Sequence, residues 1–242
     1  FFMMSWEGMR QIGGNVRLSP VATALQRNGD FSQIKTIVKD PLTGVAFPGN
    51  AIPANRLDAV AQRILNYYPQ ENQPGQLNNF YALKNAVNRN DQYIVKLDQR
   101  ASQSDNLSFR IIRNQINTWD PFDNTGDPTG QFGGARAERD SLLGLTYTRL
   151  VSPTIVNEAR FGFSRYDFSK WTGTAGLDVT AALGLPKVVT DPKLFSFPIV
   201  DISGYASMGG DKNAPSASVV NQWQWGDTLS IARGKHLVRA GA

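Results

Sequence analysis

Apolar and polar residues alternate with a period of two through Ser141–Trp171, SLLGLTYTRLVSPTIVNEARFGFSRYDFSKW. Leucines and Tyr147 take every second position before the proline, and Ala159 with two phenylalanines does so after it. Successive side chains of an extended strand point to opposite faces of a sheet. The pattern therefore predicts two strands, each with an apolar and a polar face, joined by the three-residue turn Ser152–Thr154.

Five further segments show the same alternation, so we expect about seven strands in all. Short and long connections alternate between these strands, and repeated long connections are uncommon in compact domains. In an up-and-down antiparallel sheet the two kinds of connection lie at opposite ends. The further strands are expected at Phe1–Gln11, Gln92–Arg100, Leu107–Asn117, Val219–Ile231 and His236–Gly241, with short turns at 101–105, 152–154 and 232–235 and long connections at 12–91, 118–138 and 172–218.

Outer-membrane barrels combine short periplasmic turns with long extracellular loops. The pattern therefore predicts an all-β fold, a membrane β-barrel fragment. We expect an open, curved, antiparallel up-and-down sheet of about seven strands, with long loops that carry short helices. Residues 12–91 would form a long extracellular insertion and residues 92–242 the antiparallel barrel strands.

A tilted barrel strand crosses the bilayer in about 9–11 residues. Ile155–Trp171 is longer, so Trp171 is expected beyond the lipid, and Trp223 is the better candidate for an interfacial aromatic belt. Arg113 and Asp227 interrupt the apolar parity of their strands. Either a bulge shifts the register there, or these residues lie above the membrane or pack against neighbours.

The long connections carry local helix and turn signals. Capping and proline positions favour short helices, and a proline-to-glycine pentapeptide is typical of a tight turn. The expected elements are a helix at Ser19–Arg27 capped by Ser19, a small hairpin around Asp40–Gly44, a helix from Arg56 capped by Asn55, and a helix at Val179–Leu183.

Composition narrows the function classes. The 242 residues include no cysteine and one histidine, His236, which excludes thiolate metal sites and argues against histidine-based catalysis. The net charge is +5 and mean hydropathy −0.32, with basic residues scattered rather than clustered, so nucleic-acid binding is not expected. The chain lacks a signal-peptide pattern and both of its ends look cut, so we expect a fragment of a longer protein.

Catalytic motifs are not found. Ser164 follows Gly162 but lacks the second glycine of a nucleophile elbow, and there is no phosphate-binding glycine motif, so we expect neither an enzyme nor a cofactor site. Asp120, Asp123 and Asp127 could bind calcium, but their spacing misses the EF-hand pattern and turn formation is the simpler interpretation. Glu158 and Arg160 could line a lumen, where pairing with adjacent strands is expected. Solute-binding residues cannot be assigned.

The chain resembles the TonB-dependent outer-membrane transporters of the Oar-like β-barrel family. The resemblance rests on an ordered series of short motifs along the whole chain. These motifs are Phe1–Phe2, Trp6–Arg10, Gly29–Ser32, Asp40–Gly44, Phe47–Asn50, Ile52–Asp58, Ala61–Gln62, Asp91–Tyr93, Ser152–Thr154, Val156–Arg160, Ile202–Tyr205, Asp227–Leu229 and Arg233–His236.

The resemblance implies the early barrel region of a transporter of about 22 strands. Such a protein takes up bulky nutrients across the outer membrane of a Gram-negative bacterium, using energy passed on by the TonB complex. Its expected partners are outer-membrane lipid, an unidentified solute and, through N-terminal parts and a plug that are absent here, TonB. Alternatives are a surface adhesion or binding protein, a passive pore, and a soluble two-sheet sandwich that binds carbohydrate.

Overall fold

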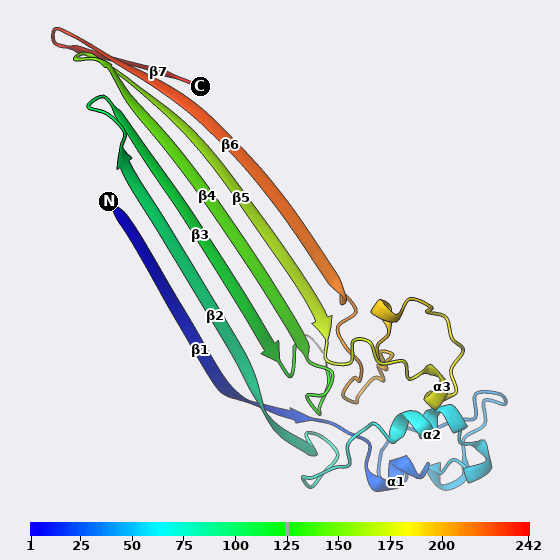
Figure 1. The fold of residues 1–242 in the computed structure, drawn as a ribbon. Coiled ribbons are helices and arrows are strands. Elements are labelled where there is room, and N and C mark those ends of the chain that lie inside the picture. Colours follow the sequence, from blue (N-terminus) through cyan, green and yellow to red (C-terminus); the bar gives the residue numbers. More distant parts are fainter. Residues whose placement is uncertain (124–125) are drawn as a thin grey trace.

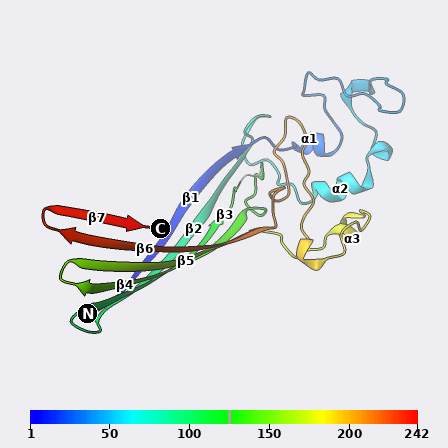
Figure 2. The same ribbon diagram turned by 90° about the horizontal axis from the view of Figure 1, so that it is seen from above.

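The computed structural model describes residues 1–123 and 126–242, in which seven strands form a single antiparallel sheet (Figure 1). The strands are hydrogen-bonded in chain order, and the sheet is open and curved (Figure 2). This confirms the predicted all-β, up-and-down fold, and the alternative of a two-sheet sandwich is wrong. The strands are β1 (Phe2–Ser19), β2 (Phe80–Arg100), β3 (Asp105–Asp120), β4 (Gly134–Ser152), β5 (Ile155–Thr172), β6 (Ser216–Arg233) and β7 (His236–Gly241).

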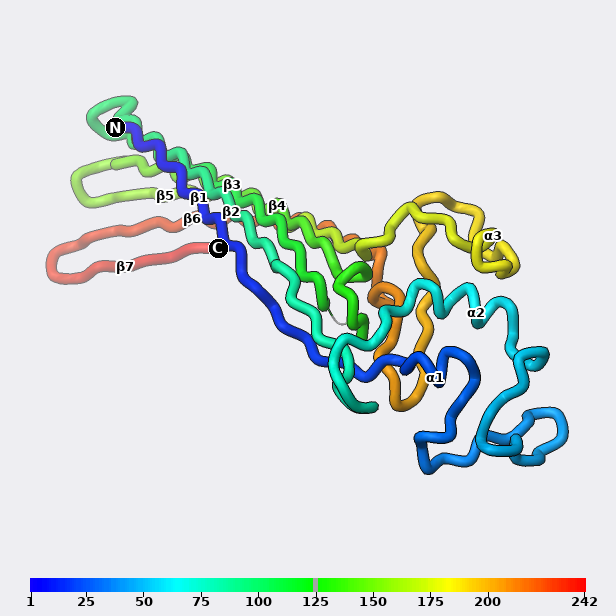
Figure 3. The backbone as a smooth tube through the Cα atoms, turned by 90° about the horizontal axis from the view of Figure 1, so that it is seen from below, coloured from blue at the N-terminus to red at the C-terminus, as the bar shows by residue number. Residues whose placement is uncertain are grey.

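Short turns lie at one end of the sheet, and all long connections gather at the other end (Figures 1 and 3). The predicted separation of the two kinds of connection is confirmed. It follows from strict antiparallel pairing in chain order, because each strand reverses direction relative to the one before it. The short turns are residues 101–104, 153–154 and 234–235, and the long connections are residues 20–79, 121–133 and 173–215.

Several strands extend further toward the long connections than the alternation predicted. β1 continues to Ser19 and β2 begins at Phe80, so the first long connection is 20–79 rather than 12–91. The missed segments are rich in glycine and asparagine, which have low strand propensity. Their conformation comes from the β1–β2 ladder, which pairs every residue of β1. The other predicted connections, 118–138 and 172–218, are shorter for the same reason.

Two helices of the first long connection begin at residues other than those predicted. α1 (Ala24–Arg27) is capped by Thr23, whose hydroxyl accepts a hydrogen bond from the Gln26 amide at 3.3 Å. Ser19 instead ends β1, so the predicted helix start was wrong. α2 (Ala59–Leu65) is capped by the Asp58 carboxylate rather than by Asn55, because only the Asp58 position precedes the first uninterrupted helical turn.

The other local predictions in the connections are confirmed. The Asp40–Gly44 turn closes a minimal hairpin, in which the Asp40 amide donates to the Val45 carbonyl at 2.8 Å. α3 (Thr180–Leu183) lies where a helix was expected, and Gly184 ends it with a φ of 72° that suits glycine. The described part of the chain also contains three 3-10 turns, η1 (Pro48–Asn50), η2 (Ala54–Arg56) and η3 (Pro192–Leu194).

The buried apolar core of the described residues lies in the long connections and not under the sheet. These connections pack together into one unit, here called the loop domain: residues 20–79, 121–123, 126–133 and 173–215. Among the described residues, no helix has the length and apolar character needed to cross a membrane. The core side chains are Val21, Tyr68, Phe132, Val179, Leu183, Phe197 and Met208.

We expect that Gly133 cannot be replaced by a residue with a side chain, since it lies directly before β4 and is closely packed against the end of β3. A Cβ there would come within 2.3 Å of the Asp120 carbonyl and 2.6 Å of Pro121 Cα, both backbone atoms that cannot rotate away. Gly133→Ala should destabilise this corner by about 1–3 kcal/mol. Gly144→Ala is the matched control, because nothing lies within 4 Å of its added Cβ. Thermal unfolding and protease cleavage at 121–133 should change in the first variant, and equal stability of both would contradict the packing described.

Candidate functional site: the two faces of the sheet and the loop domain

The cross-strand register places an apolar set of side chains on one face of the sheet. Residues that lie directly opposite each other on paired strands point to the same face of the sheet. One line of such residues crosses the sheet from Phe2 on β1, through Leu97 and Phe109, to Trp225 on β6. This face is called outward, and its apolar band is called the apolar belt. The belt comprises Phe2, Met4, Trp6, Tyr93, Val95, Leu97, Leu107, Phe109, Ile111, Leu143, Leu145, Tyr147, Ala159, Phe161, Phe163, Trp223, Trp225, Leu229, Ile231, Val238 and Ala240.

The belt is exposed, although its residues are among the most apolar in the chain. Trp225 is 80% and Phe2 80% accessible to solvent. Trp223 packs against Phe161 and Phe163, with ring centroids 5.9 and 4.3 Å apart. A continuous exposed apolar surface of this extent is typical of contact with another apolar phase. Trp223 lies within the belt, whereas Trp171 lies beyond it toward the long connections.

The two interruptions of the apolar pattern are explained by neighbours and not by bulges. The register runs without a shift through Arg113 and Asp227. Arg113 donates from Nη1 to Ser141 Oγ at 2.8 Å, and Asn157 donates from Nδ2 to Asp227 Oδ1 at 2.5 Å. Of the alternatives left open by the sequence, a bulge at these positions is therefore wrong, and contact with neighbouring strands is observed.

The opposite face, called inward, carries most of the charged and amide side chains of the strands. Lys96 and Asp98 form an ion pair of 2.8 Å, and Ser108 donates to Asp98 at 2.7 Å. Glu158 and Arg160 are inward, as expected, but they pair with each other along β5 rather than with adjacent strands. Residues two apart on a strand share a face, so this contact needs no partner strand. Ser164 is inward too, and other inward polar residues are Glu7, Gln92, Arg110, Asn114, Glu138, Asp140, Thr146, Gln222 and Gln224.

Five outward arginines border the apolar belt on its long-connection side. They come one from each of the first five strands and are called the arginine row. The row lies next to an apolar set in which Val95, Ile111 and Leu143 are directly paired. The alternation in the sequence marks only Arg113, as an interruption, and the parity that all five arginines share with the belt is the signal that could have found the others. The arginine row is Arg10, Arg89, Arg113, Arg139 and Arg165.

Inward cations hold the loop domain to the sheet. Lys170 is buried and forms ion pairs with Asp123, at 2.8 Å, and with Asp211, at 2.5 Å. The two aspartates come from different long connections, and Arg136 of β4 also pairs with Asp123. Arg17 of β1 donates to the Phe122 carbonyl at 3.2 Å and lies 4.8 Å from the centre of the Phe122 ring. The loop after β3 is therefore fixed over the inward face.

The aspartates considered as calcium ligands form turns and ion pairs instead. Asp120 Oδ1 accepts from the Phe122 amide at 3.0 Å. Asp127 is fully buried and accepts from the Thr129 and Phe132 amides at 2.7 and 2.9 Å. Asn124 and Thr125, which lie between the candidate ligands, are outside the described residues. Within the part of the chain that is described, no cluster of three or more His, Asp or Glu side chains could hold a metal ion.

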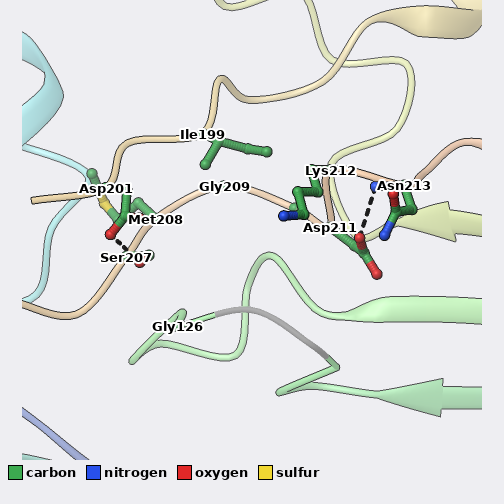
Figure 4. Close-up of a pocket in the computed structure, with 10 residues that line it drawn as sticks. Gly126, Ile199, Asp201, Ser207, Met208, Gly209, Asp211, Lys212 and Asn213 are labelled. Atoms are coloured by element: carbon green, nitrogen blue, oxygen red, sulfur yellow. Dashed lines mark hydrogen bonds between the residues drawn. The ribbon is translucent and has the colours of Figure 1, made fainter.

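An open groove with both polar and apolar walls lies between Gly126 and the 199–213 segment (Figure 4). Its volume is about 390 Å³. Ser207 donates to Asp201 at 2.9 Å, and the Asn213 amide donates to Asp211 at 2.7 Å. The carboxylates on its wall thus already have partners within the loop domain.

An apolar cavity of about 310 Å³ lies between the first and third long connections. Tyr68 lines it, and the buried Tyr68 hydroxyl has no hydrogen-bond partner among the described residues. Burial, together with the negative charges of Asp127 and Asp201, raises the pKa of Tyr68 to about 12. The phenol therefore stays protonated at neutral pH. No local sequence signal marks this cavity, because its walls meet only after two distant loops fold together. The other lining side chains are Ala22, Gln26, Phe31, Ala61, Ile64, Leu65, Val200, Ile202 and Tyr205.

A sequence model of the family described as "Outer membrane beta barrel domain" matches residues 1–242. The chain belongs to this family. Comparison with curated proteins and with solved structures gave no match. An outer-membrane β-barrel protein lies in the outer membrane, so the predicted localisation is confirmed. The apolar belt is then the lipid-facing surface, and the inward face is the side turned away from lipid.

Lys170 is expected to be a main link between this barrel sheet and its loop domain. Lys170→Met leaves two buried carboxylates, Asp123 and Asp211, without their shared cation, which should cost about 3–5 kcal/mol. Lys96→Met is the matched control: its pair with Asp98 is about a third exposed, so its loss should cost less than about 1 kcal/mol. Protease cleavage within 173–215 should become much faster in the first variant, and equal cleavage of both variants would contradict the linking role.

Proposed function

We propose that this outer-membrane protein carries bulky solutes through a polar lumen, without covalent chemistry. The contrast between the two faces of the sheet is the observation that supports this proposal most strongly. The outward face is apolar, whereas the inward face carries charged and amide side chains such as Lys96, Arg110, Asn114 and Arg160. In barrels that face water on the inside, lumen residues are polar and set solute selectivity.

Closure of the lumen requires strands beyond the seven described. β1 and β7 are the edges of the sheet, and their outer hydrogen-bonding groups have no strand partner in the described part of the chain. Unpaired backbone groups are very costly in lipid. We infer that both edges pair with further barrel strands in the membrane. A barrel much larger than seven strands leaves room for a solute pathway and an internal plug.

The position of the loop domain supports the proposal that it is the first part of the protein to contact the solute. It covers the long-connection end, which is the extracellular end in outer-membrane barrels. Arg17, Arg136 and Lys170 are all inward residues, and all of them contact the loop after β3. A solute that enters the lumen from outside would therefore pass this loop.

The proposal of TonB dependence rests on the resemblance to Oar-like transporters. The motifs that carry the resemblance lie in the turns and loops as well as in the strands, for example Asp40–Gly44 and Ser152–Thr154. Such transporters need energy from the TonB complex, which makes that complex the proposed partner. The resemblance does not identify the solute.

A second candidate function is binding at the cell surface without import. The apolar cavity favours it, because an apolar site lined by the phenols of Tyr68 and Tyr205 is suited to hold an aromatic or alkyl group. A passive pore without a TonB requirement is the third possibility. These functions differ in energy dependence, which a transport experiment measures directly.

The transport proposal is tested in cells that lack the gene and in the complemented strain. A panel of labelled siderophores, peptides and oligosaccharides is offered, with and without a protonophore. We expect the deletion to abolish uptake of at least one solute, and the protonophore to abolish it in the complemented strain. Surface binding without uptake would contradict transport and favour adhesion, and uptake that the protonophore leaves unchanged would contradict TonB dependence.

Two charge-reversal variants test the proposal that the inward face of the sheet lines the lumen. Arg160→Glu places two acidic residues together on the inward face, beside Glu158, and should slow uptake of anionic solutes relative to neutral ones. Arg149→Glu is the matched control, because Arg149 is outward, at the short-turn end. An equal effect of both variants would contradict a solute path along the inward face.

A further inference from the structure

The arginine row lies at the long-connection border of the lipid-facing surface. Its five members lie at three successive levels of outward residues along β1–β5. The first of these levels is directly next to the level of the apolar residues Val95, Ile111 and Leu143. The five members are Arg10, Arg89, Arg113, Arg139 and Arg165. The row is on the long-connection side of the belt, which is the outer-leaflet side in the orientation of outer-membrane barrels. Its position therefore matches the depth of lipid headgroups.

Charge is distributed unequally between the two borders of the belt. At the long-connection border there are five outward arginines and two outward aspartates, Asp91 and Asp167, which gives a net charge of +3. At the short-turn border, the outward charges are Arg149 and Arg233 against Asp105 and Asp227, which leaves zero. A general need for solvating charge would not produce this difference between the borders.

The two aspartates do not neutralise the whole arginine row. Both carboxylate oxygens of Asp91 accept from Arg10 Nη2, at 2.7 and 2.8 Å, and Asp167 lies 3.8 Å from Arg165. Arg113 bonds only the neutral Ser141 hydroxyl, and Arg89 and Arg139 have no carboxylate partner among the described residues. Arg89 is also directly opposite Arg10, and the single charge of Asp91 offsets only one of these two like charges.

We propose that the arginine row binds the phosphate groups of lipid headgroups in the outer leaflet, with Arg89, Arg113 and Arg139 as the principal contacts. Guanidinium groups match phosphate oxygens with paired hydrogen bonds. Basic residues beside a lipid-facing surface attract anionic headgroups. The row thus fixes the height of the barrel in the membrane, and this role is independent of which solute the protein carries.

Retention of phosphorylated lipid by the purified protein tests this proposal. The outward triple variant Arg89→Gln, Arg113→Gln and Arg139→Gln is compared with an inward triple variant, Lys96→Gln, Arg110→Gln and Arg160→Gln, which removes the same charge from the other face. Both are extracted from outer membranes in mild detergent, and bound lipid is counted by mass spectrometry. Lipid affinity should fall about fivefold for each outward arginine removed, and the inward variant should retain lipid like the unmodified protein.

A second measurement keeps the test decisive if the triple variant folds poorly. The single variant Arg139→Gln and the unmodified protein are reconstituted in vesicles of phosphatidylcholine with or without phosphatidylglycerol, and thermal unfolding is followed. Anionic lipid should stabilise the unmodified protein more than the variant. Equal stabilisation of the two, equal lipid retention in the outward and inward triple variants, or equal protection by inorganic phosphate in detergent would overturn the proposal.

Discussion

Hydrogen bonding between neighbouring strands is the constraint on which the rest of this structure depends. In a membrane no water is present to satisfy backbone amides and carbonyls, so each strand must pair with the next. The ladder of β1 with β2 runs through every residue of β1, including Gly13, Gly14 and Asn15, which favour other conformations. Once that register is fixed, the identity of each outward and inward residue is fixed with it, because a slip of one residue exchanges the two faces.

The two faces of the sheet make different contacts. Outward residues supply an apolar belt with aromatic packing around Trp223, and arginines at its long-connection border. Inward residues form ion pairs such as Lys96 with Asp98, and near the long-connection end they hold the loop domain. The loop domain has its own core, in which Phe132 packs against Phe197 with ring centroids 4.8 Å apart. The sheet and the loops are thus two packing units joined mainly by polar contacts on one face.

The sequence predicted the strands, their order and the separation of short and long connections, because a period of two over many residues is a strong signal. It failed where tertiary pairing overrides local preference, as at Gly13–Asn15, which lie in β1 although glycine and asparagine favour turns. The cap of α2 was misplaced by three residues, because Asn55 and Asp58 offer the same capping chemistry. The Lys170 ion pairs and the Tyr68 cavity could not be predicted, since each joins loops that are far apart in the chain.

The assignment of an apolar, lipid-facing side and a polar, inward side is tested most directly on β5. The chain has no cysteine, so single cysteines at successive positions from Arg160 to Ser164 can be introduced without background. Intact cells are treated with a small water-soluble thiol reagent, and membranes with a lipid-soluble quencher of a thiol-attached fluorophore. We expect positions 160, 162 and 164 to react from water and positions 161 and 163 to be quenched from lipid. Uniform reactivity, or alternation with the opposite phase, would contradict the account.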